Sequence, residues 1–342
     1  MKKIRQIVFT KPYTAEYLTV DEVDFDKIDD NAVVVKTVVS TISAGTERSN
    51  FIGDKTVSVS SDNTPFPRTC GYSSAGVVVA IGKAVTKVKI GDRAVAFWGK
   101  HKNYNILPES NIVKIENGVS FNEAALSFIA TFPLSAVRKT KLELGESCMV
   151  MGLGILGQLA VMLVKAGGAY PVIACDPVKE RREEALKNGA DYAFNPLETG
   201  FAEKVKELTG GGVNTAIEVT GVGAGLDETL DCMAKMGRVA LLGCTRDSDF
   251  TIDYYRKVHG PGISLIGAHT LARPSLESYP SHFTHEDDIK TVLNLCGGGR
   301  LPLKNLIKEI VSPKDCQAVF TRLGVDKNFP LGVQFDWGKE EK

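Results

Sequence analysis

Three glycines in a fixed spacing constrain the fold of this chain more than any other feature. Gly152, Gly154 and Gly157 form a G-x-G-x-x-G pattern directly after the short apolar run Cys148–Met151, and a second apolar stretch continues from Gln158 to Ala166. In this pattern the first glycine permits a tight turn, the second lets the backbone approach a pyrophosphate, and the third lets the helix pack closely on the strand. The helix N-terminus adds free N–H groups and a positive dipole. The segment therefore predicts a strand, a turn and a helix that bind a dinucleotide.

A carboxylate follows this turn at the spacing expected for a residue that holds the adenosine ribose. The apolar run Pro171–Cys175 predicts the next strand, and Asp176 ends it about 20 residues after the glycines. A carboxylate there accepts hydrogen bonds from the ribose hydroxyls and repels a 2′-phosphate, so it favours NAD(H) over NADP(H). Three basic residues follow closely, so NADP(H) remains an alternative cofactor: Lys179, Arg181 and Arg182. Arg181 is expected beside the adenosine. The expected pyrophosphate cradle consists of Gly152, Gly154, Ile155, Leu156 and Gly157.

Length and charge narrow the class of protein further. A chain of 342 residues is long enough to form two domains. Lys and Arg together number 41, as do Asp and Glu, so the formal net charge is zero and neither nucleic acid nor an anionic membrane is expected as a partner. No apolar stretch approaches the roughly 20 residues that span a bilayer. Seven cysteines without a C-x-x-C pattern predict free thiols in a reducing cytosol. These features predict a cytoplasmic protein with a small-molecule substrate.

The chain changes character on either side of the glycine-rich turn. The first part contains alternating or β-branched runs that predict strands: Ile4–Phe9, Ala32–Ser40, Gly76–Ile81 and Arg93–Phe97. Beyond the turn, predicted helices and strands alternate, which indicates a doubly wound parallel sheet: helix Arg181–Asn188, strand Tyr192–Phe194, helix Phe201–Leu208, strand Thr215–Val219, helix Gly225–Met236, strand Val239–Leu242 and strand Ile263–Ile266. Thr284 to Asp287 resembles a capping box that opens a helix to about Leu295, and Gly332–Asp336 predicts a last strand.

Several further motifs carry a family resemblance that covers nearly the whole chain. They are Ile42–Glu47 (I-S-A-G-T-E), Gly71–Val78 (G-Y-S-S-A-G-V-V), Val88–Val95 (V-K-I-G-D-R-A-V), Ala216–Gly221 (A-I-E-V-T-G) and Gly237–Gly243 (G-R-V-A-L-L-G). With the glycine-rich turn, this set resembles the medium-chain dehydrogenase/reductase superfamily. The resemblance implies an α/β Rossmann domain at 129–270 and a β-rich GroES-like catalytic domain at 1–128 that is completed by 271–342. It also implies an active site in the cleft between the domains and a homodimer formed through the edge strands of the Rossmann domains.

The resemblance fails at the metal ligands of the zinc-dependent alcohol and polyol branch. Where that branch has the Cys of C-G-[ST]-[DE], this chain has Ala44; where it has the His of G-H-E, this chain has Tyr72; and its third ligand falls near Ser127. Alanine offers no donor, and neutral Tyr or Ser oxygens are poor zinc ligands. The four-cysteine zinc lobe is replaced by Trp98–Tyr104, which holds no cysteine. The expectation is that zinc binds at neither site. The pattern is similar to a zinc-lacking subgroup that includes bacteriochlorophyllide a dehydrogenase and related bacterial proteins resembling sugar or cyclitol dehydrogenases.

Without a metal, a side chain must accept or donate the substrate proton. The resemblance places four candidates near the nicotinamide: Thr46, Glu47, Tyr72 and His269. Tyr72 is a phenol with a reference pKa near 10, and the His269 imidazole is matched to neutral pH. Each candidate has a structural alternative. Thr46 hydrogen-bonds the cofactor or backbone, Glu47 is a structural carboxylate, Tyr72 fills the vacated metal cavity, and His269 is a satisfied loop residue.

The remaining expected cofactor contacts lie at strand ends, where such sheets bind ligands. By the resemblance, Thr131 contacts the nicotinamide face; the strand-end residues are Thr220, Gly221, Gly243 and Cys244. The thiol of Cys244 is interpreted as a packing group. His101, between two lysines, is interpreted as part of a solvated basic turn, and His282 and His285 as residues that cap a helix or face solvent.

The sequence thus predicts a zinc-independent NAD(H)-dependent oxidoreductase that interconverts a secondary alcohol and a ketone. A sugar, polyol or cyclitol is the favoured substrate, because carriers of the A-G-T-E motif resemble enzymes of such compounds. Two alternatives stay open. One is a zinc-free enoyl or quinone reductase, which Asp176 disfavours because such enzymes usually use NADPH. The other is a catalytically silent NAD(H)-binding protein.

Overall fold

The computed structural model describes residues 1–56, 65–116, 118–245, 248–326 and 328–340, and it divides into two compact units. Unit 1 comprises residues 1–129 and 289–342, and unit 2 comprises residues 130–288. The sequence placed the second boundary after residue 270, whereas the division falls after Asp288. The physical reason is local: Arg273 donates to the Thr131 carbonyl at 3.1 Å and to Asp288 Oδ2 at 2.8 Å, which keeps its segment within unit 2.

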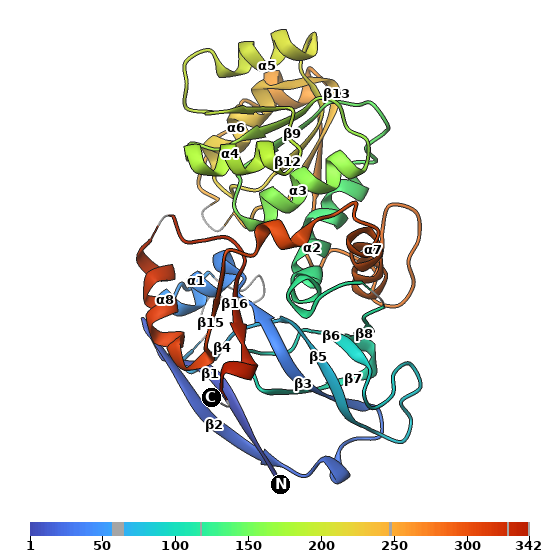
Figure 1. Cartoon of the computed structure of the whole chain (residues 1–342). Coiled ribbons are helices and arrows are strands. Elements are labelled where there is room, and N and C mark those ends of the chain that lie inside the picture. Colours follow the sequence, from blue (N-terminus) through green and yellow to red (C-terminus); the bar gives the residue numbers. More distant parts are fainter. Residues whose placement is uncertain (57–64, 117, 246–247, 327, 341–342) are drawn as a thin grey trace. The chain divides into compact units, whose positions relative to one another are not determined.

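Unit 2 is built on a parallel six-stranded sheet (Figure 1). The order across the sheet is β11 (Tyr192–Phe194), β10 (Val172–Cys175), β9 (Cys148–Met151), β12 (Val213–Glu218), β13 (Met233–Leu241) and β14 (Ser264–Gly267). The first strand of this sheet along the chain, β9, lies in its middle. The strands β10 and β11 follow on one side of β9, and β12, β13 and β14 follow on the other side. This reversal is the point at which doubly wound sheets bind ligands. The connecting helices are α3 (Ile155–Ala166), α4 (Lys179–Lys187), α5 (Phe201–Thr209) and α6 (Gly223–Asp231).

Unit 1 is β-rich and contains two sheets. The larger has the order β15 (Glu309–Val311), β16 (Val333–Asp336), β3 (Ala32–Thr41), β5 (Ser73–Ile81), β6 (Arg93–Phe97) and β8 (Ile112–Lys114), with β7 (Tyr104–Pro108) also paired to β3. The smaller has the order β2 (Thr14–Val23), β1 (Lys2–Lys11) and β4 (Arg68–Thr69). Antiparallel pairing of β16 with β3, Gln334 opposite Thr41, joins the C-terminal segment to the N-terminal one. The fold is therefore α/β, with a Rossmann-type sheet and a GroES-like β domain, as predicted.

The core of unit 1 combines both ends of the chain. Helices α1 (Ala44–Ile52) and α8 (Cys316–Val325) pack with a cluster of aromatic rings in which Phe9 meets Phe320 edge to face at 4.8 Å. Helices α2 (Phe121–Lys139) and α7 (His285–Gly297) each contribute residues to both units. The short helical turns are Phe25–Lys27, Glu109–Asn111, Tyr255–His259, Leu303–Leu306, Pro313–Asp315 and Trp337–Glu340.

Most predicted elements occur within a few residues of their expected limits, and one does not. The helix predicted at Gly225–Met236 ends at Asp231, and strand β13 begins at Met233. Met233 pairs with Val213 of β12, so cross-strand pairing prevails over the local helical periodicity. The capping box is confirmed, because Asp287 N donates to Thr284 Oγ1 at 3.2 Å at the start of α7. Within the described residues, every helix is too short or too polar to cross a membrane.

Candidate active site

The glycine-rich turn has the geometry of a phosphate cradle. Gly152 has a φ of 96°, and a Cβ on Gly157 would lie 1.8 Å from the Gly152 carbonyl oxygen, so both positions require glycine. Gly154 is different: it caps α3 with an ordinary φ of −67°, and among the described residues no atom beyond its chain neighbours lies within 4 Å of the place where its Cβ would be. The open space beside Gly154, in front of the free N–H groups of α3, fits an approaching pyrophosphate. The residues therefore fit a dinucleotide.

Asp176 lies directly behind this turn. Its Oδ2 accepts from Leu153 N at 2.8 Å and its Oδ1 from Val178 N at 2.8 Å, and these two hydrogen bonds hold the carboxylate in one orientation. The residue is 3% exposed. Each carboxylate oxygen has a second lone pair for a ribose hydroxyl. The Arg181 guanidinium lies 3.6 Å from Oδ2, whereas Arg182 donates to the Asp176 carbonyl at 2.7 Å. Arg181 is thus the basic side chain beside the expected adenosine position.

The ends of β12 and β13 approach each other closely at the same edge of the sheet. A Cβ on Gly243 would lie 2.3 Å from Gly221 N, and one on Gly221 would lie 2.7 Å from the Cys244 carbonyl oxygen. Thr220 N donates to Glu218 Oε1 at 2.8 Å, and the two side chains are also hydrogen-bonded. Burial raises the pKa of the Glu218 carboxyl, and the hydrogen bonds from Thr220 oppose that shift. The four strand-end residues predicted from the sequence therefore form one backbone-lined surface.

Thr131, predicted to contact the nicotinamide, lies beside a histidine that the sequence assigned to a cap or to solvent. His285 Nδ1 is 3.4 Å from Thr131 Oγ1, and the ring is half-buried near Phe132. Burial, followed by the positive charge of Arg273, lowers the pKa of His285 to about 3. His285 is therefore a neutral imidazole at the start of α7, and the solvent-facing interpretation is wrong.

His269 follows β14 on a half-buried loop. Its Nδ1 accepts a hydrogen bond from Leu271 N at 3.3 Å, which leaves the ring proton on Nε2. Burial and then the positive charge of Lys139 lower the pKa of His269. Lys139 itself is held by the carbonyls of Gly267, at 3.0 Å, and Ala272. In this loop conformation His269 is a neutral hydrogen-bond donor rather than a free base.

Tyr72 of unit 1 is half-buried within an aromatic group. Its Oη is hydrogen-bonded to Ser43 Oγ, and its ring lies 5.6 Å from Trp98 and 5.7 Å, edge to face, from Phe128. Trp98 is 37% exposed. Ser43 directly precedes α1, and Thr46 is half-buried in the first turn of that helix. The Tyr72 phenol is thus hydrogen-bonded to the Ser43 hydroxyl and lies beside the partly exposed indole of Trp98. The Thr46 hydroxyl is in the helix turn that follows Ser43.

Behind Ser43 lies a buried polar cluster that corrects the interpretation of His101. His101 is 0% exposed, not part of a solvated turn. Its Nε2 lies 3.0 Å from Glu47 Oε2, and its Nδ1 lies 2.8 Å from Ser40 Oγ. Glu47 Oε1 accepts from Ser43 N at 2.9 Å, so both carboxylate oxygens are occupied and the side chain is 1% exposed. Burial, followed by the negative charge of Glu47, raises the pKa of the Cys70 thiol. Glu47 thus lies in a buried hydrogen-bonded cluster, and its part in proton transfer stays a prediction.

The family's catalytic zinc does not fit the residues at its ligand positions. Ala44 carries no donor, Tyr72 Oη is hydrogen-bonded to Ser43, and Ser127 Oγ is buried and donates to the Ala124 carbonyl of its own helix at 2.7 Å. A catalytic zinc site needs three protein ligands with nitrogen, sulfur or carboxylate donors. No catalytic step is therefore assigned to zinc at these positions.

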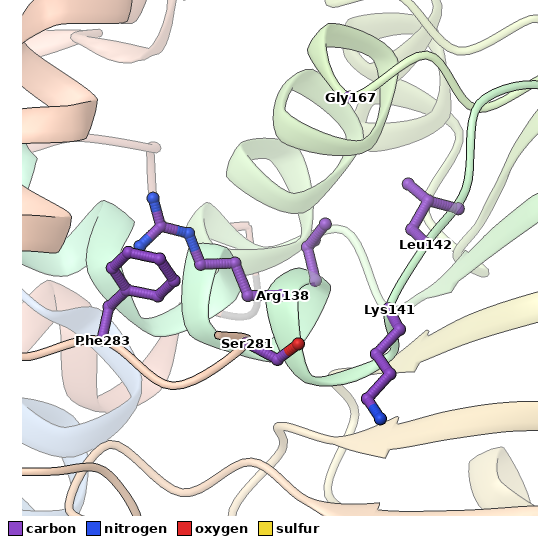
Figure 2. Close-up of a pocket in the computed structure, with 7 residues that line it drawn as sticks. Arg138, Lys141, Leu142, Gly167, Ser281 and Phe283 are labelled. Carbon is purple, nitrogen blue, oxygen red and sulfur yellow. The ribbon is translucent and has the colours of Figure 1, made fainter. Parts of the chain in front are cut away.

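A pocket of about 290 Å³ lies elsewhere in unit 2, at the C-terminal end of α2 (Figure 2). Arg138 and Phe283 lie against each other in it, with the guanidinium carbon 3.5 Å from the ring centroid. Arg138 also pairs with the buried Asp288, which it shares with Arg273. The pocket contains none of the residues predicted from the sequence for cofactor binding or proton transfer; its lining is Val137, Arg138, Lys141, Leu142, Gly167, Ser281 and Phe283.

The residues predicted from the sequence are divided between the two units. Unit 2 holds the glycine turn, Asp176, Arg181, Thr131, the strand-end residues and His269; unit 1 holds Thr46, Glu47 and Tyr72. Sequence reasoning missed Ser43, Cys70 and His285 and misplaced His101. Only His285 had a local signal, since it directly follows the capping residue of α7.

Each unit of the chain is matched by a known protein-family model. The model of the alcohol dehydrogenase GroES-like domain matches residues 29–117, and the model of the zinc-binding dehydrogenase matches residues 156–283. L-threonine 3-dehydrogenase of Thermococcus kodakarensis is 30% identical over 283 residues, which are 74% of this chain and 79% of that protein. D-guloside 3-dehydrogenase of Escherichia coli K12 is 27% identical over 245 residues, 71% of this chain and 69% of that protein.

Solved structures extend the likeness to the whole fold. An alcohol dehydrogenase from Escherichia coli CFT073, crystallised with NADH, superimposes with a TM-score of 0.83 at 18% identity and covers 98% of this chain and 100% of its own. Galactitol-1-phosphate dehydrogenase from Escherichia coli has a TM-score of 0.82 at 17% identity, with 97% and 99% covered.

A Rossmann-type unit with an open glycine cradle, joined in one chain to a GroES-like unit, defines a two-domain nicotinamide-type oxidoreductase. The relatives make this class specific. The chain belongs to the medium-chain, zinc-type alcohol and polyol dehydrogenase family and acts on CH–OH groups. This membership favours a dehydrogenase over the enoyl or quinone reductase and the silent NAD(H)-binding protein that the sequence left open.

Proposed function

We propose that this dehydrogenase interconverts a secondary alcohol and a ketone on a sugar, polyol or cyclitol, with NAD(H) and without zinc at the family's catalytic position. The observation that carries the proposal is the hydrogen-bonded pair of Tyr72 Oη and Ser43 Oγ at a position where the family has a metal ligand. A phenol there supplies a proton donor and acceptor in place of a Lewis acid. On this proposal the chain belongs to a zinc-lacking branch of the family.

The substrate class is supported by the relatives and by the aromatic group around Tyr72. Among the relatives are a D-guloside 3-dehydrogenase and a sorbitol dehydrogenase. Sugars and cyclitols have apolar C–H faces and hydroxyl edges. The partly exposed indole of Trp98 offers a flat apolar surface beside the Tyr72 and Ser43 hydroxyls. This combination suits a polar ring better than a long apolar chain.

NAD(H), held by the glycine turn and Asp176, would supply the hydride chemistry of the reaction. The protein's own residues have to handle the hydroxyl proton. During oxidation the tyrosinate form of Tyr72 accepts that proton, and during reduction the phenol donates it to the forming alkoxide. The Ser43 hydroxyl donates a hydrogen bond to the tyrosinate and so stabilises it. Within unit 1, Thr46 is the proposed hydrogen-bonding group for a substrate oxygen, and Glu47 positions Ser43 through the Ser43 backbone N–H. In unit 2, the Nε2–H of His269 remains a proposed hydrogen-bond donor.

The preference for NAD(H) rests on Asp176. Its carboxylate is fixed behind the glycine turn by two backbone N–H groups and would repel the 2′-phosphate of NADP(H). Arg181 pairs with that carboxylate and is therefore less available to a phosphate.

A homodimer is the proposed assembly. Strand β14 is an edge of the six-stranded sheet, and Leu265 at its centre is 40% exposed. An exposed edge with an apolar side chain is suited to pairing with a second copy.

The function is tested by NAD⁺ and NADP⁺ reduction against a panel of sugars, polyols and cyclitols, with matched enones and NAD(P)H in the reverse direction. Turnover of a polyol or cyclic alcohol with NAD⁺ is expected, with the metal content of the same preparation measured in parallel. Preference for NADPH with enones, or tight NADH binding without turnover of any alcohol, would contradict the proposal. The proposal would also be contradicted if chelation abolished the activity and the bound metal were lost in a Tyr72 variant.

A further inference from the structure

A cluster of three unlike metal-binding side chains lies inside unit 1, and none of them stands at the family's zinc-ligand positions. Glu47 comes from α1, Cys70 directly follows β4, and His101 lies between β6 and β7. All three are buried, and one donor atom from each lies within 4.8 Å of the other two. We propose that Glu47, Cys70 and His101 bind one divalent transition-metal ion, of which zinc is the favoured species, at a site that joins these three segments.

The distances are close to those of a coordinated set. Zinc binds nitrogen and carboxylate oxygen at about 2.0–2.2 Å and thiolate sulfur at about 2.3 Å, so tetrahedral neighbours lie roughly 3.4–3.6 Å apart. The His101 Nε2 and Glu47 Oε2 atoms are 3.0 Å apart, and the widest separation in the group does not exceed 4.8 Å. Displacements of a fraction of an ångström to about one ångström bring all three donors around one ion.

Hydrogen bonds beyond the donors orient the imidazole and the carboxylate for this role. A metal-binding histidine usually donates its second N–H to a fixed acceptor. Here His101 Nδ1 lies 2.8 Å from Ser40 Oγ, which also accepts from Trp337 Nε1 at 2.9 Å. One serine oxygen can accept both hydrogen bonds. The second oxygen of Glu47 is held by Ser43 N.

Charge balance favours a divalent ion in this place. A Cys thiolate and a Glu carboxylate together carry two negative charges, which a divalent cation neutralises, and a neutral imidazole adds none. The Cys70 thiol releases its proton to solvent as the metal binds. The surroundings are apolar, with Phe320 and Phe335 near the His101 ring, so a neutral assembly avoids the cost of an unpaired buried charge.

The backbone also makes room for the cluster. Gly71 has a φ of 84°, and a Cβ there would lie 2.3 Å from His101 Cγ. The absence of a side chain at this position lets the segment that carries Cys70 lie directly against His101. The alternative is a metal-free cluster in which a buried His101–Glu47 pair lies beside the Cys70 thiol. The experiment below distinguishes the metal site from this alternative.

The test measures metal in the full-length protein, purified without chelators and after exchange with Co²⁺. We expect one metal ion per chain by mass spectrometry and a thiolate-to-cobalt charge-transfer band in the near ultraviolet. Cys70→Ser and His101→Asn should each lose the band and most of the bound metal. Cys148→Ser is the matched control, because Cys148 is a fully buried thiol in β9 of unit 2, outside the cluster; it should keep both.

Wild-type protein with neither bound metal nor the cobalt band overturns the inference, as does a band that persists in Cys70→Ser. Should the variants fail to fold, X-ray absorption of the wild-type zinc protein decides: one sulfur with nitrogen and oxygen neighbours supports the site, and a shell without sulfur rejects it. This result is separable from the proposed function. Metal lost in Tyr72→Phe but kept in Cys70→Ser would reject both proposals, whereas the absence of metal rejects only this one.

Discussion

A phenol in place of a metal ligand changes which group takes the substrate proton. For Tyr72→Phe we expect kcat to fall by roughly 100-fold or more, because general acid–base groups contribute about 10²–10⁴ in rate. The affinity for NADH should change little, because the glycine turn and Asp176, which are proposed to hold the dinucleotide, are unaltered. Steady-state kinetics over a range of pH provides the measurement. Tyr192→Phe, an exposed residue of β11, is the control. Near-normal kcat in Tyr72→Phe would reject the assignment of proton transfer.

Selection between the two coenzymes depends on one carboxylate. In Asp176→Asn the repulsion of a 2′-phosphate is lost, and so is one charge-assisted acceptor. A hydrogen bond to a charged group contributes about 1.5–3 kcal/mol, so the KM for NAD⁺ should rise roughly 10- to 100-fold while NADP⁺ becomes a better substrate. Glu180→Gln, an exposed change on the neighbouring helix α4, should leave both values unchanged. An unchanged ratio of the two kcat/KM values in Asp176→Asn would contradict the role of this carboxylate.

Single residues differ in how far they could be predicted from the sequence. The glycines and Asp176 belong to a pattern read within about 25 residues, and the structure places them in one turn. His101 could not be predicted in this way. Its partners Glu47 and Ser40 are 54 and 61 positions away, and its neighbours along the chain are two lysines. Burial that depends on contacts between distant segments leaves no trace in local charge or periodicity.

At the level of elements, two glycines of the α3 turn should respond in opposite ways to the same substitution. In Gly154→Ala the new Cβ meets no atom of the chain but occupies the space proposed for the pyrophosphate. Thermal stability should be nearly unchanged, and the Kd for NADH should rise at least about 10-fold, or 1.4 kcal/mol. In Gly157→Ala the Cβ meets the Gly152 carbonyl at 1.8 Å, so the protein should be destabilised by at least about 1–3 kcal/mol.

Both variants are measured by thermal unfolding and by NADH titration. If Gly154→Ala binds NADH normally, the turn is not the phosphate site. If Gly157→Ala is as stable as wild type, helix α3 can move away from β9 more easily than its packing implies.

The start of α7 should make stability depend on pH. Burial lowers the pKa of His285 to about 3, from an unfolded value near 6.5. The unfolded chain therefore takes up a proton below pH 6.5 that the folded chain refuses until about pH 3, so this contribution to stability is present above pH 6.5 and is lost as the pH falls. At pH 5 the loss is about 2 kcal/mol, at 1.36 kcal/mol for each pH unit.

Urea unfolding of wild type and His285→Gln at pH 5 and pH 7.5 tests this. The variant should lose less stability between the two pH values than wild type does, whereas the exposed His259→Gln should follow wild type. The same pH dependence in wild type and His285→Gln would show that other groups cause it.

Elements defined by local periodicity were predictable, and those defined by pairing were not. The strand Cys148–Met151 and the capping box of α7 follow from residues next to one another. The change from α6 to β13 near Met233 does not, because it is decided by the register with Val213 on a neighbouring strand. The strand at Gly332–Asp336 was predicted and is β16, but its register with β3, which joins segments almost 300 residues apart, has no local signal.

At the scale of the whole molecule, β14 is an end strand of the parallel sheet. Two copies of β14 paired edge to edge would continue the six-stranded sheet into a second chain and shield Leu265. A like charge on both copies at that position opposes such pairing. Light scattering after gel filtration should therefore give twice the chain mass for wild type and the single-chain mass for Leu265→Glu. Leu197→Glu, at a position that is 77% exposed and outside the strands, should stay dimeric. A wild-type monomer would reject the dimer, and a dimeric Leu265→Glu would place its interface elsewhere.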